Sequence, residues 1–109
     1  MAIIVRKIGE ADITSETLRE INRLLPMLNP AAPRLTFSEF NRLYKSDTVL
    51  YVAVDEAAPD VFLGMASLLV TRRVIGEGVE LLDLVADEGY DGVDIESLLT
   101  ERLIGSLPG

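Results

Sequence analysis

Two apolar segments near the middle of the chain constrain its fold more than any other feature. Residues 48–55 (TVLYVAVD) and 61–71 (VFLGMASLLVT) are almost continuously apolar, and only the short segment EAAPD separates them. Strands that are apolar on both sides lie inside sheets that are covered on both faces. The two segments therefore predict an antiparallel pair of strands at the centre of a sheet whose two faces are packed.

Helical spacing of apolar residues predicts three helices. The first, over residues 13–28, has Thr14 or Ser15 as its N-cap. The second follows a capping box formed by Thr36 and Glu39. The apolar stripes of the three helices are Leu18, Ile21, Leu25 and Leu28, then Phe37, Phe40 and Tyr44, and finally Ile95, Leu98, Leu99 and Leu103.

Two further strands, residues 2–8 and 78–87, complete the order β-α-α-β-β-β-α. Because consecutive strands commonly pair as neighbours, we expect a mixed but mainly antiparallel four-stranded sheet in chain order. The two N-terminal helices should cover one face of the sheet and residues 94–104 the other. The predicted fold class is α/β (α+β), in a single domain over residues 1–109.

The composition excludes several kinds of chemistry. The chain has no Cys and no His, so it lacks a thiolate nucleophile, disulfides and the commonest metal ligand and general base. A net charge of −8 argues against binding to nucleic acid or to anionic membranes. No apolar run approaches the roughly 18 residues of a membrane span, and the N-terminus does not resemble a signal peptide. We therefore expect a cytoplasmic protein.

The turn between the last strand and the last helix is rich in glycine and acid. A strand, a glycine turn and a helix N-terminus often bind phosphate through backbone N–H groups. Residues 87–101, however, contain six carboxylates and no Lys or Arg, and these carboxylates would repel an anion. The plainer interpretation makes Asp91 or Asp94 the N-cap and places Glu96 in the first turn of the helix. The pattern lacks ligands that a calcium-binding loop requires, so no metal site is predicted.

Four segments resemble, in order and spacing, the front half of the GNAT acetyltransferase superfamily: LLPMLNPAAPRLT, VLYVAVD, FLGMASLLV and LLDLVADEGYDGVDIESLLTERLI. The resemblance implies that the fourth strand hydrogen-bonds the pantetheine arm of acetyl-CoA. It also implies that the following turn wraps the pyrophosphate of the cofactor. The residues that would bind acetyl-CoA by this resemblance are Leu84, Val85, Tyr90, Gly92 and Ile95.

The turn departs from the pattern of that family. A typical family turn is similar to EAYRGRGIGRALL, whereas this chain has EGYDGVDIESLL. Asp91 and Val93 stand where basic residues are typical, and Asp94 and Glu96 stand where glycines are typical. Cβ atoms would crowd a pyrophosphate at these positions, and carboxylates would repel it. We therefore expect no bound cofactor, with acetyl-CoA as the cofactor if the chain is an active enzyme.

The candidate catalytic residues are Glu80, Asp83 and Tyr90. By the resemblance, a glutamate general base on the fourth strand would fall near Leu82. Glu80 shares the strand parity of Leu82, whereas the side chain of Asp83 is expected to point to the opposite face. The alternative is that Glu80 and Asp83 are half-exposed strand residues. The chain ends before the later segment that often supplies a proton-donating tyrosine in the family, which leaves Tyr90 of the turn to test.

Three functions remain open from the sequence. The first is a catalytically degenerate GNAT-like binding or regulatory module, and the second is an active N-acetyltransferase that a partner or a dimer completes. The third is a structural or assembly protein. Because residues 78–85 (GVELLDLV) are an apolar edge without Pro or Lys, we expect a homodimer through residues 78–86, the last helix, or both. No nucleic acid or membrane is expected as a partner.

Overall fold

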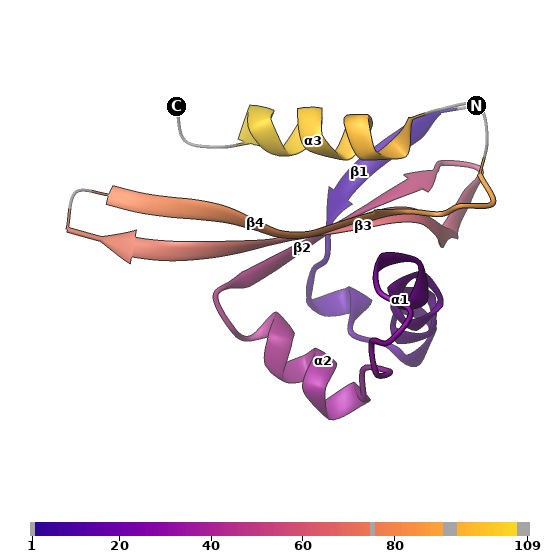
Figure 1. Cartoon of the computed structure of the whole chain (residues 1–109), viewed down its shortest axis with the longest axis horizontal. Helices are drawn as coiled ribbons and strands as arrows, with labels where there is room; N and C mark the ends of the chain where they lie inside the picture. The colour runs from indigo at the N-terminus through magenta and orange to yellow at the C-terminus, as the bar shows by residue number, and fades with distance from the viewer. Residues whose placement is uncertain (1, 75, 91–93, 107–109) are drawn as a thin grey trace.

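The computed structural model describes residues 2–74, 76–90 and 94–106. Its elements follow the order expected from the sequence, with one short 3₁₀ turn added (Figure 1). They are β1 (Ile3–Lys7), η1 (Glu10–Asp12), α1 (Ser15–Leu28), α2 (Phe37–Tyr44), β2 (Thr48–Asp55), β3 (Ala58–Arg73), β4 (Gly76–Ala86) and α3 (Ile95–Ser106).

The four strands form one sheet in the order β1-β2-β3-β4. All three pairings between neighbouring strands are antiparallel. Figure 1 shows α1 and α2 on one face of the sheet and α3 on the other. The predicted chain-order sheet, with helices on both faces, is confirmed.

Two of the strands, β3 and β4, begin before the segments that predicted them, and β3 also ends later. β3 begins at Ala58, which pairs with Asp55, so the turn from β2 contains only Glu56 and Ala57. Pro59 is compatible with this pairing because it lies at the start of its strand. At the other end, β3 and β4 continue to a turn where Gly76 has φ of 122°, a conformation that favours glycine.

The helices begin where the sequence predicts. Thr14 caps α1 by accepting the backbone N–H of Thr17 at 3.2 Å. Thr36 and Glu39 form the predicted capping box of α2. Pro26 lies inside α1, and the helix continues to Leu28, its predicted end. Among the described residues, no helix is long and apolar enough to span a membrane.

The larger core cluster lies between the sheet and helices α1 and α2. Leu24 and Phe40, one from each helix, are completely buried in it. They pack among Val52, Val54 and Phe62 of the sheet, with Ile8, Ile21, Met65 and Val85 completing the cluster. Leu24 lies outside the predicted stripe of α1, because the buried face of the helix is wider than four positions.

The opposite face of the sheet packs against α3. Ile95, Leu99 and Leu103 are buried there, as the apolar stripe of the last helix predicts. Gly64 on β3 permits this close packing, since a Cβ atom at this position would lie 2.6 Å from Cγ2 of Ile95 and 2.8 Å from the carbonyl oxygen of Val85. The position of α3 therefore depends on a glycine in the centre of the sheet.

Candidate functional site

The turn after β4 is held in place by Asp87. The N–H of Asp87 donates to the carbonyl of Leu63 at 2.8 Å, and its carboxylate accepts the N–H of Gly89 at 2.9 Å. The N–H of Tyr90 donates to the Asp87 carbonyl at 3.1 Å. The turn is thus tied to β3 and to itself through one residue. Gly92, a predicted cofactor-binding residue, lies outside the described residues.

An arginine from α1 joins this turn to the sheet. Arg23 donates to Asp87 Oδ2 at 2.7 Å, to Glu20, and to the carbonyl of Phe62 at 2.7 Å. Glu20 also accepts the N–H of Phe62 at 2.9 Å. This network is not visible in the sequence, because 64 positions separate Arg23 from Asp87 and only the i,i+3 pair of Glu20 and Arg23 is local.

The network changes the titration of its members. Burial acts to raise the pKa of Asp87, but the Arg23 hydrogen bond, the Gly89 N–H and the Arg23 charge together hold that pKa below its ordinary value. The hydrogen bond to Glu20 is the largest cause of the raised pKa of Arg23. The carboxylate of Asp87 is therefore committed to a structural role at the turn.

The lowered pKa of Asp87 predicts a pH-dependent contribution to stability. A carboxylate with a depressed folded-state pKa stabilises above its unfolded pKa, about 3.9, and this stability is lost as pH falls through the folded value. Asp87→Asn should lower the free energy of unfolding by about 1–2 kcal/mol at neutral pH. Urea unfolding at several pH values measures the difference in unfolding free energy between the parent protein and Asp87→Asn. This difference should shrink below about pH 4, because Asp87 of the parent protein becomes protonated there. A difference that does not change with pH would contradict the assignment.

The carboxylate of Asp94, the residue before α3, caps the N-terminus of this helix. Asp94 accepts the N–H of Ser97 at 3.1 Å and its hydroxyl at 2.7 Å, as the N-cap interpretation predicts. These bonds, led by the one from the Ser97 hydroxyl, lower the pKa of Asp94. A cavity of about 300 Å³, the α3 cavity, opens beside this end of the helix. Its lining residues are Leu84, Asp94, Glu96, Ser97, Thr100 and Glu101, three of them acidic and none basic.

The other residues predicted to bind a cofactor are divided between the two faces of the sheet. Val85 is buried in the core under α1 and α2. Ile95 is buried in the cluster under α3, where half-buried Tyr90 and Leu84 pack against it. Only Leu84 of this set lines the α3 cavity. The side chains of these residues serve mainly the packing of β4 and α3.

A β-bulge in β4 changes the direction of the side chains around Leu82, where the family resemblance places a general base. Asp83 pairs with Ser67 and Leu81 with Leu68, so Leu82 has no partner on β3. Leu82 and Asp83 consequently line the same cavity, under α1 and α2. The expectation that these two side chains face opposite sides of the sheet is wrong, because the bulge breaks the alternation of the strand.

This second cavity, the Asp83 cavity, has a volume of about 240 Å³. The hydroxyl of Ser67 donates to Asp83 Oδ2 at 2.8 Å in its wall. Glu80 is exposed, pairs with Leu69 and does not line the cavity. The cavity is lined by Ile21, Leu25, Leu28, Leu35, Leu43, Thr48, Leu50, Met65, Ala66, Ser67, Leu82 and Asp83.

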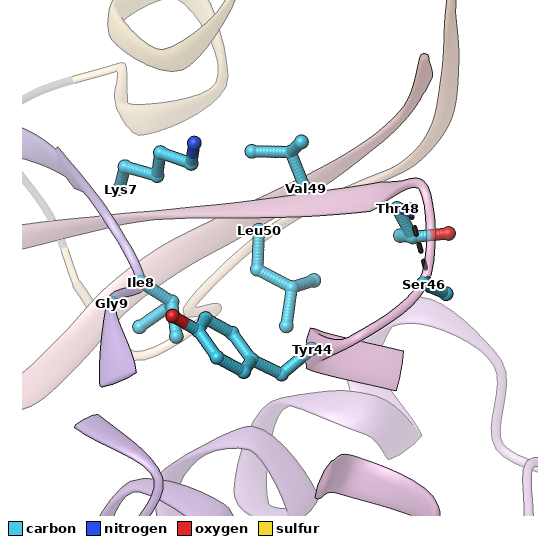
Figure 2. Close-up of a pocket in the computed structure, with 8 residues that line it drawn as sticks. All are labelled: Lys7, Ile8, Gly9, Tyr44, Ser46, Thr48, Val49 and Leu50. Carbon is cyan, nitrogen blue, oxygen red and sulfur yellow. Dashed lines mark hydrogen bonds between the residues drawn. The ribbon is translucent and has the colours of Figure 1, made fainter. Parts of the chain in front are cut away.

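A larger hollow of about 440 Å³ lies where β1 and β2 meet the end of α2 (Figure 2). Figure 2 shows Lys7 and Val49 on one side of β2 and Tyr44 and Leu50 on the other. Lys7, the charged residue of this lining, is thus separated by the strand from the Tyr44 hydroxyl. Ligand sites have polar groups that converge on one point, so this hollow is not the candidate site.

Solved structures with this architecture identify the fold. A glucosamine-6-phosphate N-acetyltransferase from Arabidopsis thaliana matches with a TM-score of 0.72 and 20% identity, over 96% of this chain and 74% of the plant chain. The chain has the GNAT fold. A Trypanosoma brucei acetyltransferase also has it, with a TM-score of 0.68 and 23% identity over 95% of this chain and 73% of its own.

An aminoglycoside acetyltransferase from a soil metagenomic sample is a third GNAT-fold neighbour. It matches with a TM-score of 0.70 and 16% identity, over 94% of this chain and 68% of its own. No protein-family model and no curated protein matches the sequence. The GNAT fold recognised from the four sequence segments is therefore confirmed by structure, with sequence identity too low to carry an activity across.

Proposed function

We propose that this GNAT-fold chain is a catalytically degenerate binding or regulatory module that does not retain acetyl-CoA. The observation that carries the proposal is the acidic lining of the α3 cavity, at the helix end where the family resemblance expects the pyrophosphate. Asp94, Glu96 and Glu101 line this cavity without a basic residue. Each carboxylate within about 4 Å of a phosphate costs about 1 kcal/mol even in water.

The N-cap strengthens this argument. A helix end binds anions through N–H groups that have no partner within the helix. In α3, Asp94 accepts the N–H of Ser97, which is one of these groups. The carboxylate also neutralises the positive end of the helix dipole. An incoming pyrophosphate would have to displace a bound carboxylate and approach two more.

Matched variants test whether the acidic turn prevents the binding of acetyl-CoA. Asp94→Asn with Glu96→Gln removes charge while preserving shape, and Asp91→Arg with Asp94→Gly and Glu96→Gly restores the family pattern. Melting temperatures with acetyl-CoA, CoA or buffer provide the readout. Acetyl-CoA should not change the melting temperature of the parent protein and should raise that of the amide variant only slightly. It should clearly raise the melting temperature of the triple variant, since a ligand at about 100 times its Kd stabilises a protein by about 2.7 kcal/mol. A triple variant whose melting temperature does not change with acetyl-CoA would show that the turn is not what prevents binding.

An active N-acetyltransferase is the second candidate function. The observation that favours it is Asp83, an exposed carboxylate that lines a cavity beside the bulge of β4, on the strand where the resemblance expects a general base. Two of the neighbours are acetyltransferases for glucosamine 6-phosphate and for aminoglycosides. The test is whether the protein releases CoA from acetyl-CoA when an amine is present. If it does, and if Asp83→Asn abolishes this release, the acetyltransferase becomes the first candidate function.

We also propose that the chain forms a homodimer through β4, with or without α3. β4 is an edge of the described sheet, and its Leu81 and Leu82 are 48% and 45% exposed. Light scattering at tens of micromolar should give the mass of a dimer. Leu81→Lys should produce a monomer, because a charged edge opposes strand pairing. Val61→Lys, at an equally exposed position on β3, is the control. A monomeric parent protein would contradict this proposal.

A further inference from the structure

β1 is an outer strand of the described sheet, and its backbone groups alternate in direction. The N–H of Ile8 donates to a carbonyl of β2 at 2.8 Å, and the carbonyl of Ala2 accepts the N–H of the residue after β2 at 2.9 Å. Hydrogen-bonded pairs alternate along two antiparallel strands. The residues of β1 that direct their N–H and carbonyl groups to the open edge are therefore Ile3, Val5 and Lys7.

A groove lies beside this edge, on the face of the sheet that carries α3. It has a volume of about 400 Å³, and its lining residues are Ile3, Ile4, Val5, Leu98, Glu101 and Arg102. Ile3, Val5 and Leu98 pack against the buried cluster under α3, so much of the groove surface is apolar. The groove therefore offers apolar contacts to the side chains of a strand that pairs with β1.

Lys7 provides a cation at one end of the edge. It pairs with Tyr51, whose side chain packs against the cluster that contains Leu103 of α3, so Lys7 lies on the α3 face. Figure 2 shows Lys7 on the side of β2 that is opposite Leu50. Lys7 is exposed, and within the described parts of the chain it takes part in none of the ion pairs. A carboxylate opposite Lys7 would thus favour one register of a paired strand.

We infer that β1 binds an extended peptide in which an acidic residue is followed by two apolar residues at alternate positions. In antiparallel pairing, which all neighbouring strands of this sheet use, the acidic residue lies opposite Lys7. The apolar residues then lie opposite Val5 and Ile3, and their side chains enter the groove because opposite residues share a face. The backbone hydrogen bonds provide affinity, and the alternate side chains provide specificity.

Other occupants fit this edge less well. A second copy that pairs β1 with itself about Val5 would place Lys7 opposite Ile3, so the cation would gain no acidic partner. A peptide with a basic residue in the inferred register would bring a like charge opposite Lys7, which destabilises a strand pair. The inference also goes beyond the proposed function, because the groove shares only Glu101 with the α3 cavity.

Fluorescence anisotropy with a labelled, end-capped peptide, Glu-Thr-Val-Thr-Val, tests the inference. The parent protein should bind this peptide saturably and should bind Lys-Thr-Val-Thr-Val about fivefold more weakly, the scale of an exposed charge pair. Lys7→Glu should reverse this preference. Lys45→Glu is the matched control, because it makes the same change at an exposed position outside the groove, and it should keep the preference of the parent protein.

Hydrogen exchange distinguishes strand pairing from other modes of binding. The peptide should slow the exchange of the N–H groups of Ile3, Val5 and Lys7 and leave that of Arg6, which points to β2, unchanged. Val5→Pro removes one N–H of the edge and should abolish binding, whereas proline is compatible with an edge position whose N–H points outward. Val5→Ala keeps this N–H and should still show slowed exchange at Ile3 and Lys7.

Three results would overturn the inference: no saturable binding of the acidic peptide, unchanged exchange of the edge N–H groups, or a peptide preference that Lys7→Glu leaves unchanged. A dimer that Val5→Pro dissociates, without peptide binding, would assign the edge to a second copy and also overturn it. Titration of acetyl-CoA separates the inference from the proposed function. If acetyl-CoA binds and the peptide preference still depends on Lys7, the degenerate role fails and the peptide site stands. If neither ligand binds, the peptide site alone fails.

Discussion

Replacing Phe40 with alanine should lower the free energy of unfolding by about 3–5 kcal/mol, the usual cost of removing a buried aromatic ring. Phe40 has no exposed surface, and it is the buried residue of α2. A helix of 8 residues is not stable alone, so α2 depends on this contact with the core. Chemical unfolding measures the loss.

Phe37 provides a matched control on the same helix. It is 47% exposed, and its ring meets that of Phe40 edge-on at 6.5 Å between centroids. Phe37→Ala should therefore cost only about 0.5–1.5 kcal/mol, the range of such aromatic pairs. Equal losses for the two variants would show that α2 is not anchored through Phe40.

Replacing Arg23 with methionine should lower the free energy of unfolding by about 2–3 kcal/mol. The change leaves Glu20 and Asp87, whose side chains are 16% and 15% exposed, without their cation. Removing one partner of a buried pair costs about 3–5 kcal/mol, and the 35% exposure of the Arg23 side chain reduces this value. The carbonyl of Phe62 also loses its side-chain donor. Unfolding in urea gives the total effect.

Hydrogen exchange locates the effect of Arg23→Met within the molecule. The N–H of Gly89, which Asp87 accepts, should exchange faster in the variant, while amides of β2 should change only with global stability. Arg19→Met, at an exposed position of the same helix, should change neither measurement. The double variant with Asp87→Asn should lose less than the sum of the single variants, because the two residues share one interaction. If the losses of the two single variants add up in the double variant, Arg23 does not hold the turn through Asp87.

The elements of this fold were predictable because each has a local signal. Continuous apolar runs predicted β2 and β3, and the capping box at Thr36 predicted the start of α2. The apolar stripe from Ile95 to Leu103 predicted which face of α3 packs on the sheet. In each case the residues that determine the element lie within a few positions of one another, so sequence spacing contains the information.

The candidate site was less predictable because it depends on contacts between distant segments. Strict alternation placed Leu82 and Asp83 on opposite faces, and nothing in the sequence of β4 marks the bulge that brings them together. The cation that anchors Asp87 comes from a helix at the other end of the chain. Asp94 was the exception, since an N-cap lies directly before its helix and was predicted as one of two alternatives.

We propose that this GNAT-fold chain does not bind acetyl-CoA. Calorimetric titration of acetyl-CoA into the unmodified chain tests that claim most directly. We predict no saturable binding at submillimolar concentration, because the acidic lining of the α3 cavity repels the pyrophosphate and Asp94 already caps the helix. Saturable binding with a micromolar dissociation constant, which corresponds to about −8 kcal/mol, would contradict the account and place the acetyltransferase first.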